Sequence, residues 1–210
     1  MTPKRLQSFI YVLVKLVLDK TKERQYTSNM KLTSLDLEMN QPSGKIVQIG
    51  AVIGDTDTGE ISQRLRIYVN PGEPIVPFIT ELCGITQEQI DKEGMPLDDA
   101  YQLLKDFHRK YTDFLNPVTW GGGDSAEVRE QLSPAAREDW CFGRRWIDAK
   151  TLAVSRMIAR DNKVFSGGLG TAMNRMGLKF DGRKHDAQDD AENTFRIYHH
   201  MLYLMRHGEF

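Results

Sequence analysis

Three short runs of apolar and β-branched residues follow one another early in the chain, and they constrain its fold most strongly. They span residues 32–37, 46–53 and 61–69, and turn-forming Gly, Pro, Asn and Asp residues separate them. Runs of this length that are bounded by turn residues are typical of β-strands. The pattern therefore predicts a β-meander.

Helical spacing replaces the strand pattern after the meander. Apolar residues recur at three- and four-residue steps within 77–111 and again within 187–205. Two short strand candidates lie between these segments, at 117–120 and 146–148, and the second precedes a predicted helix at about 151–160. A meander followed by alternating strands and helices predicts an α/β fold in which helices cover a mixed sheet.

The composition is that of an ordinary globular protein. The 210 residues suit one domain. Because 28 Lys and Arg nearly balance 29 Asp and Glu, no overall cationic field is available to hold nucleic acid by its phosphates. The two cysteines, Cys83 and Cys141, are far apart in the sequence, which argues against a zinc site or a disulfide framework and predicts a reducing, cytoplasmic location.

The first 29 residues do not fit this pattern. Residues 9–18 are strongly apolar, but they provide about half of the ~20 residues that a membrane-spanning helix needs. Charged residues follow where a signal peptide would have its cleavage site, so we predict neither membrane association nor secretion. We interpret 1–29 as an N-terminal extension, either an accessory helix or sequence upstream of a functional start at Met30, and 30–210 as the functional domain.

An acidic pair, Asp36 and Glu38, alternates with Leu35 and Leu37 in the first predicted strand. The two-residue period of a strand places both carboxylates on one face and both leucines on the other. Two carboxylates within about 4 Å repel each other by about 4 kcal/mol at an effective dielectric near 20, and protonation or a cation relieves this repulsion. Oxygen ligands favour Mg²⁺ or Mn²⁺. Taken alone, however, such a pair is more commonly a solvated strand face.

Two further acidic segments lie far from this pair in the sequence. Asp124 follows three glycines at the end of a predicted strand, where it either points toward a ligand or caps the next helix. The segment 185–190, with one histidine and three aspartates, opens the final helix, where carboxylates commonly complement the helix dipole. Spacing alone leaves the choice between Asp189 and Asp190 open.

Together, these segments resemble the motifs of the DnaQ-like exonucleases, the DEDDh branch of the ribonuclease H-like superfamily, which removes nucleotides from 3′ ends. The resemblance rests on 34–39 with the following 47–52, on 120–124, and on the H-x-A-x-x-D pattern at 185–190. Residues 80–86 are also similar, so the resemblance covers about 30–204. It implies a ribonuclease H-like mixed five-stranded sheet, an antiparallel meander plus parallel strands, flanked by helices.

The resemblance implies roles for individual residues. The implied ligands of two divalent ions, Mg²⁺ or Mn²⁺, are Asp36, Glu38, Asp124 and Asp190. His185 is the implied general base, which requires that it lie in a loop before the helix. Asp186 and Asp189 are then expected to be solvated charges at the helix start. The positions that match those seating the terminal base and sugar are Leu37, Met39, Gly84 and Ile85.

The activity that the resemblance implies is hydrolysis of phosphodiester bonds at the 3′ end of single-stranded DNA or RNA. Two alternatives stay open: a metal-dependent hydrolase of nucleotides or very short oligonucleotides, and a non-catalytic nucleic-acid-binding accessory subunit of the same fold. Candidate residues for guiding the strand are Arg144, Arg145, Arg183 and Lys184. The apolar stripe at 198–205 suits a homodimer face as well as a core.

Overall fold

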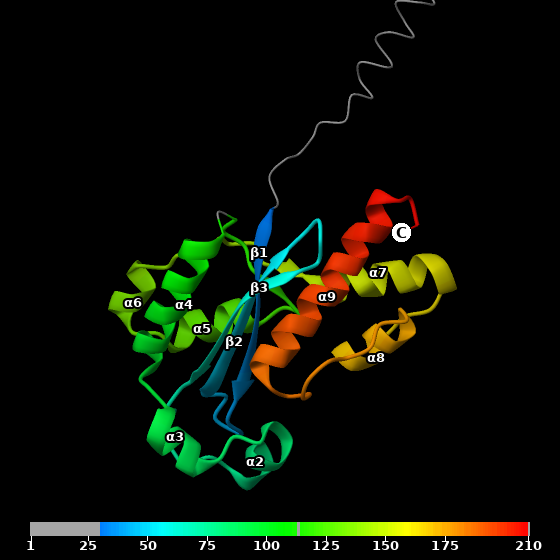
Figure 1. Cartoon of the computed structure of the whole chain (residues 1–210). Coiled ribbons are helices and arrows are strands. Elements are labelled where there is room, and N and C mark those ends of the chain that lie inside the picture. Colours follow the sequence, from blue (N-terminus) through cyan, green and yellow to red (C-terminus); the bar gives the residue numbers. More distant parts are fainter. Residues whose placement is uncertain (1–29, 113, 210) are drawn as a thin grey trace, which may run out of the picture.

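The computed structural model describes residues 30–112 and 114–209, so the predicted extension 1–29 lies outside the described residues. A five-stranded sheet forms the centre of this part of the chain, and helices cover both of its faces (Figure 1). The predicted mixed five-stranded sheet flanked by helices is therefore confirmed.

The strands follow the order β3-β2-β1-β4-β5 across the sheet. Their bounds are Lys31–Met39 for β1, Ile46–Asp55 for β2, Ile61–Tyr68 for β3, Val118–Thr119 for β4 and Ile147–Asp148 for β5. β1, β2 and β3 are joined antiparallel, which confirms the meander, whereas β4 is parallel to β1 and β5 is parallel to β4. β1 is longer than the predicted run, so it carries both Asp36 and Glu38.

The helices of the first half are α2 (Pro77–Cys83), α3 (Gln87–Glu93) and α4 (Leu97–Tyr111), and those of the second half are α5 (Asp124–Gln131), α6 (Pro134–Glu138), α7 (Ala149–Asp161), α8 (Leu169–Arg175) and α9 (Ala187–Arg206). The segment 77–111 divides into three helices: Gly84 adopts a left-handed conformation, with φ 72°, and ends α2, and Gly94 is the C-cap of α3. Thr86 then starts α3, since its hydroxyl oxygen accepts a hydrogen bond from the Gln89 amide at 3.1 Å.

Each face of the sheet packs on a different group of helices. On one face, Leu35 and Leu37 of β1 join a core cluster with residues of α4 and α5. On the other face, Leu32 and Val52 pack against Phe195 of α9. Asp36 and Glu38 therefore face α9 while the two leucines enter the core, as the strand period predicts.

Helix α9 lies close to β2 because two glycines of that strand leave room for it. A Cβ atom at Gly50 would come within 2.0 Å of the carbonyl carbon of Ala187, and one at Gly54 within 2.2 Å of the Phe195 ring. Any other residue at these positions would push the helix away from the sheet. The two glycines thus set the distance between α9 and the strands that it crosses.

The apolar stripe of α9 is mostly core in this chain. Tyr198, Met201 and Leu204 are buried, whereas Tyr203 and Met205 are exposed.

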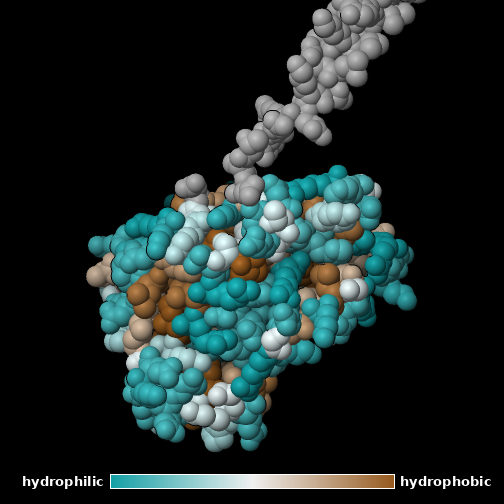
Figure 2. All heavy atoms as spheres, in the orientation of Figure 1, coloured by the Kyte–Doolittle hydropathy of each residue, from teal (hydrophilic) through white to brown (hydrophobic). Residues whose placement is uncertain are grey.

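Figure 2 shows an apolar region of the surface beside α4. A shallow groove at the β3 edge is lined by residues including Leu65, Ile67, Met95 and Leu103. None of the described helices combines the length and the hydropathy needed to cross a membrane.

Replacement of Gly54 by alanine tests the close packing of α9 on the sheet. The new methyl group overlaps the Phe195 ring, so we expect Gly54→Ala to lower the free energy of unfolding by about 1–3 kcal/mol. Urea denaturation measures this change. Gly122→Ala is the control because a Cβ atom at Gly122 has no atom within 4 Å. Equal stability of the two variants would contradict the packing argument.

Candidate active site

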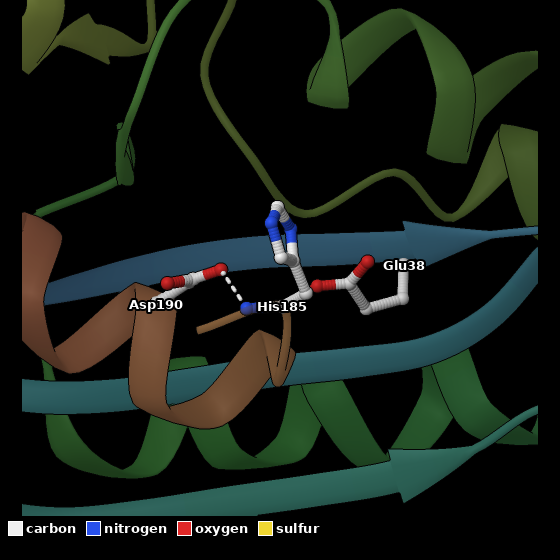
Figure 3. A group of neighbouring side chains, drawn as sticks. All are labelled: Glu38, His185 and Asp190. Atoms are coloured by element: carbon white, nitrogen blue, oxygen red, sulfur yellow. Dashed lines mark hydrogen bonds between the residues drawn. The ribbon is translucent and has the colours of Figure 1, made fainter. Parts of the chain in front are cut away.

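The acidic pair of β1 meets the start of α9 on one face of the sheet. Single ligand atoms of Glu38, His185 and Asp190 lie within 4.8 Å of one another, so these three side chains could hold a common metal ion (Figure 3). Asp36, from the same strand face as Glu38, lines the same cleft. Segments about 150 residues apart in the sequence therefore meet at one place.

His185 lies in the loop directly before α9, as the motif requires. It has a φ of 61°, in the left-handed region, and the next residue, Asp186, is the N-cap of the helix. The His185 amide donates a hydrogen bond to Oδ2 of Asp190 at 3.0 Å, and the imidazole projects between the carboxylates of Asp190 and Glu38 (Figure 3). The left-handed residue and this hydrogen bond together aim the exposed imidazole into the cleft.

The carboxylates of the site are harder to ionise than ordinary ones. Burial raises the pKa of Asp36 well above its usual value, and the charges of Asp190, Asp124 and Glu38 raise it further. Burial also raises the pKa of Glu38 to about 7 and the pKa values of Asp190 and Asp124 to about 6. A cluster of oxygen donors that repel one another fits a divalent cation, because a cation relieves the repulsion that protons otherwise relieve.

Asp124 contributes its charge to this group from the start of α5. The N-cap of α5 is Gly123, and no side chain caps the helix, so the alternative in which Asp124 serves as the cap is wrong. Gly123 has a φ of 149°, which a residue with a side chain rarely adopts, and the glycine run thereby lets Asp124 begin the helix close to β1.

Asp36, Glu38, His185 and Asp190 line a cleft with a volume of about 380 Å³, whereas Asp124 is not among its lining residues. Leu37 lines this cleft, as does Lys184. The lining residues that sequence reasoning did not single out are Trp120, Gly168, Leu169, Gly170, Thr171 and Phe180. Trp120 belongs to the quoted motif around Asp124, but nothing in the local sequence signals that Phe180 lies near the carboxylates. The cleft lining thus combines carboxylates with aromatic rings and a lysine.

The other predicted substrate residues, Met39, Gly84 and Ile85, are not among the residues that line the cleft. Met39 is half-buried against the core, and the side chain of Ile85 is buried beneath α2 and α3. Gly84 lies beside the guanidinium of Arg183, which leaves no room for a Cβ atom there. Gly84 and Ile85 would therefore meet a ligand through their backbone, and the roles of all these residues stay predictions.

Asp186 and Asp189 are not the solvated charges that the sequence indicated. Asp186 is only 9% exposed, and its Oδ1 accepts a hydrogen bond from Nη2 of Arg66 at 2.7 Å. Asp189 accepts one from the Arg183 amide at 2.7 Å. The expectation was wrong because β3 brings Arg66 to the helix start, a contact that no local sequence pattern reveals.

Cys83 does more than pack in the core, because it contacts a carboxylate of the site. Its thiol is buried and donates a hydrogen bond to Oε2 of Glu38 at 3.0 Å. Burial raises the pKa of this thiol well above the usual range, and the bond to Glu38 raises it further, so the sulfur keeps its proton. Cys83 therefore acts as a donor that orients the Glu38 carboxylate.

Comparisons with known proteins agree with this geometry. An exonuclease family model (RNase_T) matches residues 33–116, a match that ends before Asp124 and the start of α9. The chain is 32% identical to mouse ERI1 exoribonuclease 2 over 176 residues, which cover 72% of this chain and 24% of the relative. It is 25% identical to the Drosophila melanogaster 3′-5′ exonuclease Snipper over 184 residues, covering 78% of this chain and 62% of that protein.

A solved structure shares the fold. The nuclease domain of 3′hExo, a DEDDh family member bound to rAMP, superposes with a TM-score of 0.68 at 21% identity, covering 89% of this chain and 96% of that one. The chain spans about a quarter of the length of the mouse relative.

The raised pKa of Glu38 predicts how pH changes the stability of the metal-free protein. The folded carboxyl, with a pKa of about 7, binds its proton more tightly than the unfolded one, with a reference value of 4.5. The free energy of unfolding should therefore fall as pH rises from about 4.5 to about 7. In EDTA at pH 8, Glu38→Gln should be more stable than the wild type by up to about 3 kcal/mol, measured by urea denaturation.

The exposed residue Glu130 gives the control for this comparison. Glu130→Gln should leave the pH dependence unchanged. A Glu38→Gln variant that is no more stable than the wild type at pH 8 would show that the surroundings of Glu38 do not disfavour its ionised form.

The thiol of Cys83 is tested through the same carboxylate. The hydrogen bond from Cys83 lowers the pKa of Glu38, so Cys83→Ala should raise that pKa and move Mn²⁺ binding to higher pH. Cys83→Ser keeps a donor and should bind Mn²⁺ with the pH dependence of the wild type. Titrations of Mn²⁺ at several pH values, followed by the electron paramagnetic resonance signal of the free ion, measure the shift. Identical curves for the alanine variant and the wild type would remove the proposed role of the thiol.

Proposed function

We propose that this chain, which matches an exonuclease family model over residues 33–116 and resembles the DnaQ-like, DEDDh exonucleases, hydrolyses phosphodiester bonds one at a time from the 3′ end of single-stranded nucleic acid. The observation that carries this proposal is the meeting of Asp36, Glu38, His185 and Asp190 in one cleft. All the family's catalytic positions are filled, which favours an enzyme over a non-catalytic binding subunit.

Members of this family depend on divalent metal ions. We propose that two Mg²⁺ or Mn²⁺ ions are held here by Asp36, Glu38, Asp124 and Asp190. The all-oxygen donor set, with its raised pKa values, supports hard cations of this kind. The chemistry that such ions supply when bound is activation of water and stabilisation of the departing 3′ oxygen.

The residues around the ligands bind the substrate and move a proton. The exposed imidazole of His185, which projects between the Asp190 and Glu38 carboxylates, takes the proton of the attacking water. The backbone that carries this imidazole is held in place because the His185 amide donates a hydrogen bond to Asp190. Among the other lining residues, Lys184 contacts phosphate, and Trp120 and Phe180 offer flat apolar surfaces to the terminal nucleotide. Stacking of this kind depends little on the identity of the base.

We propose RNA as the preferred substrate. The mouse relative is an exoribonuclease, and the structural neighbour 3′hExo binds rAMP. The Drosophila melanogaster relative carries the broader description of a 3′-5′ exonuclease, so DNA is the natural comparison in any assay. The cytoplasmic location and the homodimer stay predictions. The cysteines that suggest a reducing compartment are both buried and free.

The proposed activity is tested with the full chain and 5′-labelled substrates. Single-stranded RNA should yield a descending ladder in Mg²⁺ or Mn²⁺ and stay intact in EDTA, and single-stranded DNA and duplexes should be cleaved more slowly. Asp36→Ala should abolish cleavage because it removes a ligand. His185→Ala should slow turnover by about 10²–10⁴ while Mn²⁺ still binds, because it removes only the base.

The same assay separates the alternatives. Cleavage of dinucleotides with little action on a 20-residue strand would favour the hydrolase of very short oligonucleotides. Metal-dependent binding of intact RNA without cleavage under any condition would favour the non-catalytic subunit. Undiminished turnover by His185→Ala would remove the assignment of the base.

A further inference from the structure

The start of α9 is held from the side opposite the cleft by residues of β2 and β3. We propose that Arg66 and Gln48 are positioning residues that hold Asp186 and thereby place His185 and Asp190 opposite the acidic pair of β1. The inference deepens the proposed function, on which its consequence for metal binding rests.

A row of residues across three strands sets the geometry. Asp36 of β1 is the register partner of Gly50 of β2, and Gly50 is the register partner of Arg66 of β3. Side chains that share such a row lie on the same face of the sheet. The first residue of α9, Ala187, lies directly over Gly50, where a Cβ atom would come within 2.0 Å of its carbonyl carbon. The helix start therefore lies between Asp36 on one side and Arg66 on the other.

Arg66 reaches the helix through its N-cap residue. Its Nη2 donates to Oδ1 of Asp186 at 2.7 Å and lies 3.6 Å from Oδ1 of Asp189. The same Oδ1 of Asp186 also accepts hydrogen bonds from the amides of Gln188 at 3.1 Å and Asp189 at 3.2 Å. One carboxylate thus joins β3 to the first turn of α9. Because the side chain of Asp186 is only 12% exposed, solvent screens this ion pair less than a surface one.

Gln48 holds the same turn from β2. Its Oε1 accepts a hydrogen bond from the Ala187 amide at 2.7 Å, and its Nε2 donates to Oδ2 of Asp186 at 3.5 Å. The Ala187 amide is one of the N–H groups that a helix cannot satisfy internally. Gln48 is also the register partner of Glu38, so the residue that holds the helix lies beside a predicted metal ligand.

This arrangement matters because His185 occupies a conformation that needs support. A non-glycine residue with a φ of 61° persists only where its neighbours hold it. Asp186 is its next neighbour, and the backbone carbonyl of Asp186 accepts the Asp190 amide at 2.8 Å. Release of Asp186 would therefore loosen both the histidine and the aspartate of the site. Loss of an outer-shell partner typically weakens metal binding about 10- to 100-fold.

The chain contains a matched control for this inference. Arg64 lies two residues before Arg66 on the same strand, and its Nε pairs with Oε2 of Glu192 of α9 at 2.6 Å. This ion pair also joins β3 to α9, with an arginine of similar exposure, 47% against 36%. Glu192 lies beyond the first turn, away from His185, so loss of the Arg64 pair should affect stability without affecting the site.

The experiment compares Arg66→Met with Arg64→Met in the full chain. Mn²⁺ affinity, measured without nucleic acid by the signal of the free ion, should fall about 10-fold in Arg66→Met and less than about 2-fold in Arg64→Met. Hydrogen exchange of the amides of Gln188, Asp189 and Asp190 should become faster only in Arg66→Met. Arg66→Lys should recover part of the affinity. Equal effects of the two methionine variants on affinity and exchange would overturn the inference.

A double variant tests whether Arg66 acts through Asp186. Asp186→Asn keeps an oxygen for the helix amides but loses the charge, so the double variant Arg66→Met with Asp186→Asn should bind Mn²⁺ no more weakly than whichever single variant has the lower Mn²⁺ affinity. Additive losses would show that Arg66 acts by another route. Hydrogen exchange also separates this inference from the proposed function. If the wild type neither binds Mn²⁺ nor cleaves RNA, the proposed function fails. Faster exchange of the Gln188, Asp189 and Asp190 amides in Arg66→Met alone would still establish the positioning role.

Discussion

Burial of carboxylates beside other negative charges is the constraint on which the rest of this structure depends. Asp36, Glu38, Asp124 and Asp190 all have raised pKa values, because burial and neighbouring negative charge both oppose ionisation. A fold brings such groups together at a cost in stability, which neutralisation by a cation or a proton offsets. The sheet, whose second strand is completely buried, and the long helix that crosses it provide the stability that offsets this cost.

The arrangement also explains how a chain with a net charge of -1 suits a polyanionic substrate. Cations at the carboxylates would supply positive charge where the scissile phosphate lies, so the surface as a whole need not be basic. The arginines nearest the site serve other purposes: Arg66 is paired with Asp186, and Arg183 packs against Gly84. Lys184 is left to line the cleft. Arg144 and Arg145, the other candidates for guiding a strand, are absent from the cleft lining within the described residues.

The match to the family model and the geometry of the site support different parts of the proposed function. The family model matches the meander and α2 to α4 but ends at residue 116, whereas the histidine and the last aspartate come about 70 residues later in the sequence. Only the spatial arrangement shows that these later residues meet Asp36 and Glu38. The mouse relative is an exoribonuclease, and this chain corresponds to about a quarter of its length.

Local sequence patterns alone determined the meander, the strand that carries Asp36 and Glu38, and the side of it that the two carboxylates share, because strand periodicity depends on neighbouring residues. The motif likewise required His185 to precede α9, which its φ of 61° confirms. Only the tertiary structure decided that Asp186 is buried against Arg66, that Cys83 donates to Glu38, and that Phe180 lines the cleft. These contacts join residues from 45 to 120 positions apart or depend on several elements at once, so no local pattern encodes them.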